Sequence, residues 1–186
     1  MKRNNIDTMI AVILVIIAAS ARVINASLHM PNFVPIAAIG LFSGAVIKEK
    51  RSLAFLVPLL GQFLGDVYFA LFTHIAGFYD LAGMLFNYGA LVAATALGTT
   101  MKQIKPASTV AYLLGASTVF FIVSNLGYFA HGWNGYTFSG LIKTYVDGLP
   151  FYKSTLAGDM IGGIAIFGSY IVVQQMVEKK AQKVKA

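Results

Sequence analysis

Three charged side chains lie within long apolar stretches of this sequence, where water cannot stabilise them. Arg22 lies near the end of the first stretch, Asp66 in the third and Asp159 in the last. Ionisable groups in apolar segments are costly, and as a rule they face a bundle interior or a cavity, where they pair or bind a ligand. One arginine and two aspartates predict a buried pairing, with one carboxylate left to meet a cation, a proton or a donor group of a ligand.

Other polar residues of the apolar stretches are predicted to lie at the same depth as these charges. At a rise of about 1.5 Å per residue, Arg22, Asp66 and Asn125 fall about 20–25 Å along helices that run outward. Asn87 and Asp159 fall about 6–9 Å below the outer surface, on helices that run inward. The candidate substrate-binding residues are those of this outer layer and of the loops and aromatic side chains around it: Arg22, His29, Asn32, Asp66, Asn87, Asn125, Tyr128, Trp133 and Asp159.

The inner part of each stretch carries no formal charge. A channel or a proton relay needs polar groups through the full depth of the membrane. The pattern instead predicts a cup that opens outward and is closed below by apolar packing. Such a site suits the capture of a small-molecule substrate, a vitamin or similar micronutrient, for uptake.

The elements that must hold these side chains are membrane helices. Of the 186 residues, 58% are hydrophobic and 11% charged, against about 45–50% and about 25% in soluble domains. Six apolar stretches come close to the roughly 20 residues that cross the hydrocarbon layer. They cover residues 8–24, 33–47, 53–72, 81–100, 108–129 and 155–177. We therefore predict an all-α membrane protein, a single integral membrane domain over residues 1–186 with six transmembrane helices in one bundle.

The basic residues predict the orientation of the bundle. If the six stretches all cross, 11 of the 14 Lys and Arg residues fall on one side and only Arg22, Lys143 and Lys153 on the other. Basic loops stay in the cytoplasm, so both termini are expected there, in a multi-pass protein of the cell inner (plasma) membrane. This placement also accounts for the net charge of +7. The lipid bilayer is thus an expected partner, and nucleic acid is not.

Three local patterns have two interpretations each. The first stretch ends at Ala19-Ser20-Ala21, which fits a signal-peptide cleavage site, although Arg22 directly after it disfavours cleavage. Residues 130–154 form an expected outer loop, either an interfacial aromatic belt with a short surface helix at 141–149 or a lid over the site. The G-x-x-x-G steps at Gly40 and Gly158 indicate close packing inside the bundle or a docking face for a partner subunit.

Two other functions compete with capture. Gly65-Asp66 and Gly158-Asp159 place two carboxylates on two spans, as in intramembrane aspartyl proteases. A charged arginine at the same depth would lower the pKa of both carboxyls and disfavour an acid–base dyad, so we do not expect an enzyme. A ligand-free structural subunit is the other alternative. The chain has no cysteine and no Walker motif, and we expect neither a metal nor a cofactor; any use of ATP would come from a partner.

Several short motifs together resemble an uncharacterised bacterial family of six-span integral membrane proteins. They are His29-Met30-Pro31-Asn32-Phe33-x-Pro35, Leu41-Phe42-x-Gly44, Pro58 with Asp66, Ser124-Asn125, and Leu149-Pro150-Phe151-Tyr152-x-x-Thr155-Leu156-x-Gly158-Asp159. That family in turn is similar to the substrate-binding S components of energy-coupling-factor vitamin transporters.

The resemblance implies an outward-facing site built from the first outer loop, the loop before the last span, and spans four to six. It also implies docking on a transmembrane coupling subunit driven by two ATPases. S components carry an A-x-x-x-A docking motif on the first span, whereas here Ala18 is followed four residues later by Arg22. A solitary S-like protein is therefore the alternative to a docked one.

Overall fold

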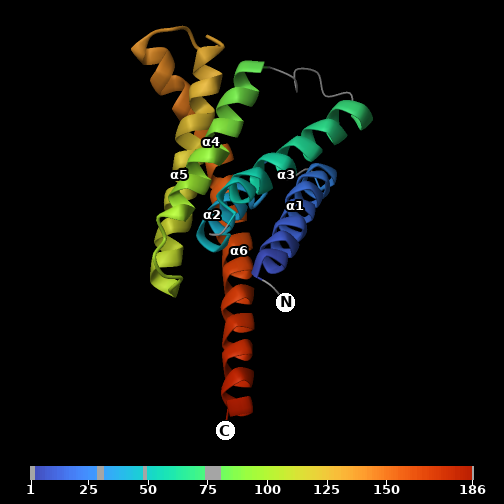
Figure 1. Ribbon diagram of the computed structural model, residues 1–186. Helices are drawn as coiled ribbons and strands as arrows, with labels where there is room; N and C mark the ends of the chain where they lie inside the picture. Colours follow the sequence, from blue (N-terminus) through green and yellow to red (C-terminus); the bar gives the residue numbers. More distant parts are fainter. Residues whose placement is uncertain (1–2, 29–31, 48–49, 74–80, 186) are drawn as a thin grey trace.

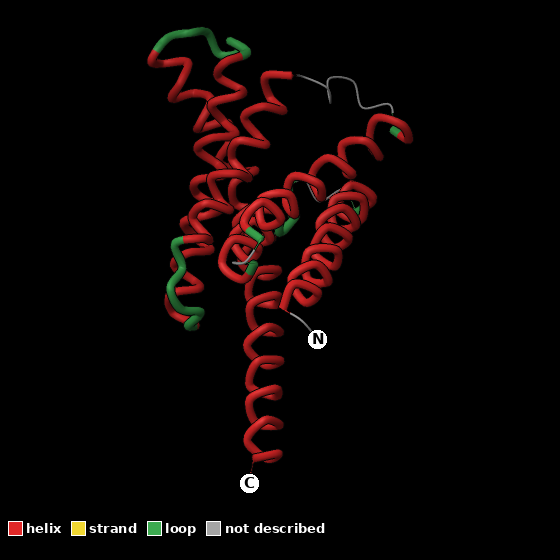
Figure 2. Tube along the Cα trace, viewed as in Figure 1, coloured by secondary structure: helices red, strands yellow, loops and turns green. Residues whose placement is uncertain are grey.

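The computed structural model describes residues 3–28, 32–47, 50–73 and 81–185, and these residues form α-helices without any strand (Figure 1). The helices are α1 (Arg3–Ser27), α2 (Ile36–Val46), α3 (Arg51–Phe72), α4 (Leu81–Thr99), α5 (Pro106–Ala130) and α6 (Phe138–Lys185). Loops make up only a small part of this trace (Figure 2). The predicted all-α architecture is confirmed.

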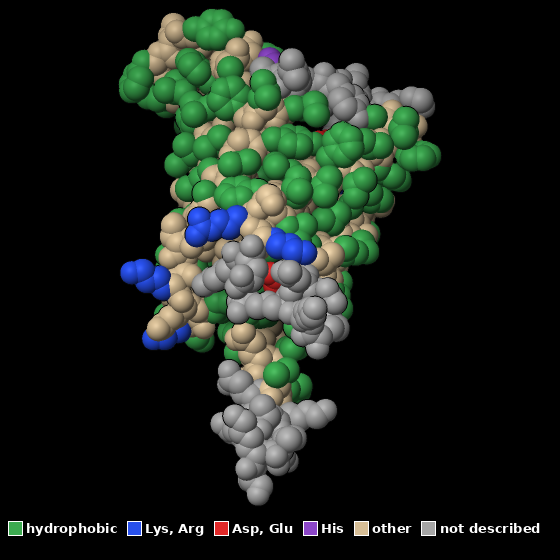
Figure 3. All heavy atoms as spheres, in the orientation of Figure 1, with side chains coloured by type: hydrophobic (Ala, Val, Ile, Leu, Met, Phe, Trp, Pro, Cys, Tyr) green, Lys and Arg blue, Asp and Glu red, His purple; other side chains and the backbone are tan. Residues whose placement is uncertain are grey.

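Four helical segments are long and apolar enough to cross a membrane. They are Ile6–Ser27 of α1, Arg51–Phe72, Pro106–Ala130, and Phe138–Val177 of α6. Large apolar side chains are exposed along them, and hydrophobic side chains cover much of the face in Figure 3, with Lys and Arg gathered lower down. Apolar surface of this extent suits contact with lipid. The number of crossings stays a prediction.

α2 lies at the centre of the bundle. All of its residues are buried, and it packs against each of the other five helices. At about 1.5 Å per residue it covers about 16 Å, roughly half of a hydrocarbon layer of about 30 Å. The helix begins three residues after the start of the predicted stretch 33–47, because Pro35 disfavours a helical conformation in the residue before it.

Small residues let α2 and the segment before it approach their neighbours closely. A Cβ on Gly40 would lie 3.0 Å from Thr95 Oγ1 of α4, and one on Gly44 would collide with the backbone of α4. On α6, a Cβ on Gly158 would lie 2.9 Å from the backbone nitrogen of Val34. Both G-x-x-x-G steps therefore pack inside the bundle, and neither is free to form a docking face.

α6 is where the fold differs most from the sequence prediction. The connection after α5 covers only residues 131–137, and α6 then continues from Phe138 to Lys185, about 72 Å at the usual rise per residue. The predicted outer loop at 130–154 and the separate surface helix at 141–149 are thus wrong. That stretch is the first part of α6.

Contacts with α5 explain why this stretch is helical and packed. Tyr145 donates a hydrogen bond from its hydroxyl to the Ile122 carbonyl at 2.8 Å, and the hydroxyls of Thr118 and Tyr152 lie 2.8 Å apart. Pro150 lies inside the helix. Because this part of α6 is bound to α5 along its length, it does not form the predicted lid.

The close approach of residues 33–35 to α6 generates a matched test. A Cβ on Gly162 would collide with the ring of Pro35, whereas a Cβ on Gly168 would meet nothing within 4 Å. Overpacking costs about 1–3 kcal/mol, while Gly to Ala at an unhindered helical site stabilises by up to about 1 kcal/mol. We expect Gly162→Ala to lower the thermal midpoint of the detergent-purified protein and Gly168→Ala to maintain or raise it. Equal midpoints for the two variants would contradict the packing described above.

Candidate functional site

An ion pair joins α1 to α3 near one end of the bundle. Arg22 Nη2 lies 2.6 Å from Asp66 Oδ1, and the two side chains are only 14% and 6% exposed. Gly65 makes the contact possible, because a Cβ at that position would collide with the Arg22 side chain. The sequence left Asp66 and Asp159 as the two possible partners of Arg22, and the structure shows Asp66.

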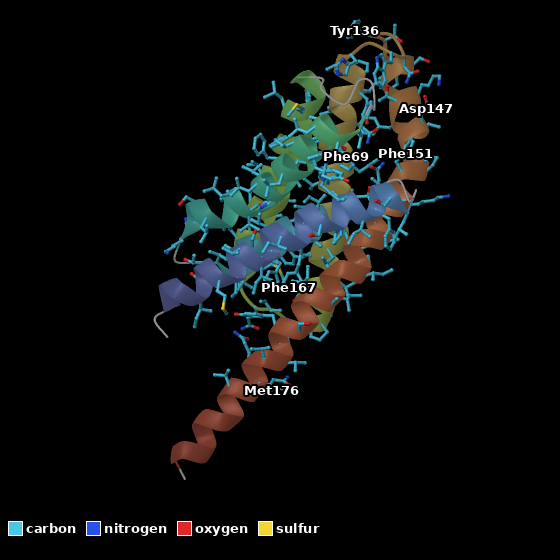
Figure 4. The ribbon with its side chains drawn as sticks, turned by 90° about the vertical axis from the view of Figure 1, so that its right-hand side faces the viewer. Phe69, Tyr136, Asp147, Phe151, Phe167 and Met176 are labelled. Carbon is cyan, nitrogen blue, oxygen red and sulfur yellow. The ribbon has the colours of Figure 1, made fainter. Side chains whose placement is uncertain are left out.

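Three further side chains complete what we call the Arg22–Asp66 cluster. Tyr88 of α4 donates its hydroxyl to Asp66 Oδ2 at 2.8 Å, and Gln62 donates Nε2 to Asp66 Oδ1 at 3.3 Å. The ring of Phe69 lies beneath the guanidinium, 5.7 Å from Arg22 Cζ, which adds a cation–π attraction. In Figure 4, Phe69 lies among the helices of the bundle, whereas Met176 lies far along α6. The cluster therefore connects α1, α3 and α4.

Two buried polar atoms beside this pair have unmet hydrogen-bonding capacity. Arg22 Nε and Asn25 Oδ1 are each shielded from water and have no hydrogen-bond partner in the part of the chain that the structure describes. Arg22 and Asn25 are three residues apart on α1, so their side chains lie on the same side of the helix. One atom is a donor and the other an acceptor. Unmet buried groups are rare in folded proteins, and a binding site is one of the explanations for them.

The cluster lies at the end of the bundle away from the basic connections. Arg22 and Asp66 stand within about 10 Å of the last residues of α1 and α3, and Tyr88 within about 11 Å of the first residue of α4, at the usual rise. These three ends lie in the upper half of Figure 1. Lys50 precedes the opposite end of α3, and Lys102 follows the opposite end of α4. The orientation predicted from the sequence assigns this end of the bundle to the outer side of the membrane.

Asp159 does not join this cluster. The prediction that Arg22, Asp66 and Asp159 lie together in one outer layer is therefore wrong. Its side chain is fully buried, where Oδ1 accepts the backbone N–H of Ala38 at 2.9 Å and Oδ2 accepts the hydroxyl of Ser117 at 2.8 Å. Ala38 is in the first turn of α2, so the carboxylate caps that helix from α6. The first N–H groups of a helix have no partner within it and attract negative charge.

The depth of Asp159 explains the error. Because α6 begins at Phe138, Asp159 lies about 32 Å from its first residue and not close to the outer surface. Its partner Ser117 lies about 17 Å from the first residue of α5, in the middle of that helix. The carboxylate predicted to await a cation or a ligand donor already has two protein donors.

The remaining candidates lie apart from the cluster. Asn125 donates to the carbonyl of Phe121 in its own helix at 2.8 Å and packs against Gly148. The rings of Tyr128 and Trp133 are in tilted contact near the turn between α5 and α6, with ring centres 5.4 Å apart, and Trp133 is 73% exposed. The structure assigns two other candidates no contact with the cluster: Asn32 is exposed with a φ of 60°, and Asn87 is half-buried on α4. His29 lies outside the described residues.

Sequence reasoning missed four members of the site, although each had a signal. Gln62 precedes Asp66 by one helical turn, and Phe69 follows it by nearly one. Asn25 follows Arg22 by the same spacing. Tyr88 also gives a signal, because a tyrosine hydroxyl buried in an apolar helix needs a hydrogen-bond partner.

A model of a protein family matches the chain over residues 2–182, and its description is "Family of unknown function (DUF6580)". The chain therefore belongs to this family, in agreement with the resemblance to an uncharacterised family. No protein with curated annotation and no solved structure matches the chain.

The ion pair makes a prediction for stability. Removing one partner of a buried pair costs about 3–5 kcal/mol, because it leaves an uncompensated charge. We expect Asp66→Asn to destabilise the protein strongly and the double variant Arg22→Gln with Asp66→Asn to recover part of that loss. A double-mutant cycle on unfolding in detergent measures this coupling. The exposed pair of Lys143 and Asp147, 2.7 Å apart, is the control and should show little coupling; equal coupling in the two pairs would contradict the assignment.

Proposed function

We propose that this member of the DUF6580 family captures a small molecule, a vitamin or similar micronutrient, at the outward-facing end of a membrane-embedded helix bundle. The observation that carries the proposal is the pair of unmet polar atoms, Arg22 Nε and Asn25 Oδ1, beside a charge pair shared by three helices. A ligand that supplies the missing acceptor and donor would recover the free energy lost by burying them unpaired.

The shape of the polar region supports capture over conduction. The Arg22–Asp66 cluster occupies the outer end, while the core around α2 consists of buried apolar side chains such as Leu41, Leu91 and Leu113. Polar groups in that core, such as Ser43 and Asp159, are bonded to backbone or to other helices. The bundle therefore has a polar outer end closed from below by tight packing, as a capture site requires.

The basic residues support an orientation with both termini in the cytoplasm. The connections that carry Lys50 and Lys102 lie at the end opposite the cluster, and the positive-inside rule assigns that end to the cytoplasm. The cluster then faces the outside. In this orientation the protein takes up its ligand from the external medium.

The source of energy for uptake would be a partner. The chain has no Walker motif, so coupling to ATP would need a transmembrane coupling subunit with ATPases, such as the one on which S components of energy-coupling-factor transporters dock. On α1, Ala11 and Ala18 are buried, and Ala18 packs against Gly61 of α3. A coupling subunit would therefore contact the exposed side of α1, where Val12 and Ile16 lie.

The competing function is an intramembrane enzyme that uses the carboxyls of Asp66 and Asp159, and the geometry of these two residues does not favour it. An aspartyl dyad needs two carboxyls in contact, but Asp66 bonds to α1 and α4 while Asp159 bonds to α2 and α5. A ligand-free structural subunit is the alternative that the experiments below distinguish.

Orientation can be tested cleanly because the chain has no cysteine. Tyr136, at the turn between α5 and α6, and Lys102, after α4, are both exposed. We expect Tyr136→Cys to react with a membrane-impermeant maleimide on intact cells and Lys102→Cys to react only after permeabilisation. The reverse pattern would place the cluster in the cytoplasm and end the proposal of uptake.

Ligand capture can be tested by native mass spectrometry of the protein purified from cells grown in rich medium. We expect a small molecule to remain bound to the wild type and to the control Lys143→Gln, which loses an exposed positive charge near the first residue of α6. The double variant Arg22→Gln with Asp66→Asn, which leaves no uncompensated charge, should remain folded, as judged by gel filtration, and lose the molecule. A wild type that is folded and carries no ligand would instead favour the structural subunit.

A further inference from the structure

We infer that the ligand is uncharged and presents a carbonyl and an N–H group side by side, as amides, lactams and ureido compounds do. The inference rests on the proposed function, since it specifies the ligand of the same site. It follows from two independent properties of that site: the balance of its charges and the type of its unmet polar atoms.

The charge of the site is already matched. The guanidinium of Arg22 has its counter-charge in Asp66 at 2.6 Å, and Tyr88 and Gln62 donate to the same carboxylate. A second anion beside Arg22 would meet the charge of Asp66 in a poorly screened environment, and a cation would meet that of Arg22. A neutral ligand avoids both repulsions.

The hydrogen-bonding demand of the site is nevertheless unmet. Among the described residues, Arg22 donates a hydrogen bond from Nη2 to Asp66, and its Nε–H has no acceptor. Asn25 Oδ1 has no donor there either, although its residue is one helical turn further along α1. The complement of a donor beside an acceptor is a carbonyl beside an N–H. A simple carboxylate or an ether offers only acceptors and would leave Asn25 unmet.

Access to these atoms requires movement of the side chains around them. Each has less than 1 Å² exposed, and the Arg22 side chain lies directly over Gly65. The ligand thus enters as the outer ends of α1 and α3 part, and it is shielded from water once bound. Such shielding is what gives a pair of hydrogen bonds high selectivity for the matching group.

The first experiment identifies the bound compound. The purified wild-type protein is denatured, and the released molecule is analysed by tandem mass spectrometry. A compound that is neutral at pH 7 and contains an amide, lactam or ureido group supports the inference. A carboxylate, a phosphate ester or an organic cation overturns it while the proposed function stands. No compound at all contradicts the proposed function itself.

The second experiment separates binding from stability with one substitution. Asn25→Leu replaces the unmet acceptor by an apolar group of similar size. If Asn25 Oδ1 accepts a hydrogen bond from the ligand, the substitution lowers ligand retention about tenfold or more, as expected when one buried hydrogen bond is lost. It should also maintain or raise the thermal midpoint of the ligand-free protein, because an unsatisfied buried oxygen has been removed.

A purely structural role for Asn25 predicts the opposite combination, a lower midpoint with unchanged retention. Asn25→Asp is the companion variant, since it retains the oxygen acceptor but adds a negative charge to a site whose charges are already matched. We expect it to bind the neutral compound less well than the wild type does. Wild-type retention by Asn25→Leu overturns the inference even if the released compound is neutral.

Discussion

Backbone N–H groups in an apolar interior must find acceptors, and in this protein that requirement is met by a carboxylate from another helix. α2 begins inside the bundle, so its first N–H groups have neither water nor a preceding turn to satisfy them. Asp159 of α6 accepts from Ala38 with one oxygen and from Ser117 of α5 with the other. One side chain thus holds three helices together at mid-depth.

The position of this cap determines how the rest of the bundle can pack. Because α2 is anchored at its first turn, the non-helical residues 33–35 must lie against α6, and only glycine at positions 158 and 162 leaves room for them. At its other end, Ser43 donates to the carbonyls of Gly40 and Ala54, which connects α2 to α3. The central helix therefore has hydrogen-bond partners on neighbouring helices near both of its ends.

The sequence predicts what depends on composition and local spacing, and it fails where distant segments meet. Helical class, the membrane-like surface and the pairing of Arg22 with an aspartate follow from hydropathy and from the cost of burying charge, whereas the choice of Asp66 over Asp159 does not. The role of Asp159 depends on the position of Ala38, 121 residues away, which no local pattern encodes. The start of α6 was missed because polar residues such as Lys143 and Asp147 lower the hydropathy of a stretch whose other side packs on α5.

Asp66 and Asp159 therefore differ in kind, although the sequence makes them look alike. Asp159 lies at the centre, where both of its oxygens accept hydrogen bonds and a change would disturb three helices. Asp66 lies where α1, α3 and α4 end, and α1 packs only against α3 and α2, so that end has fewer constraints. Unmatched buried atoms lie at the outer end, at Arg22 Nε and Asn25 Oδ1, and also near the first residues of α1 and α5, at Asp7 Oδ2 and Thr109 Oγ1. Of these positions, the outer end combines unmatched atoms with a charge pair that joins α1 to α3, and this combination supports a binding site there.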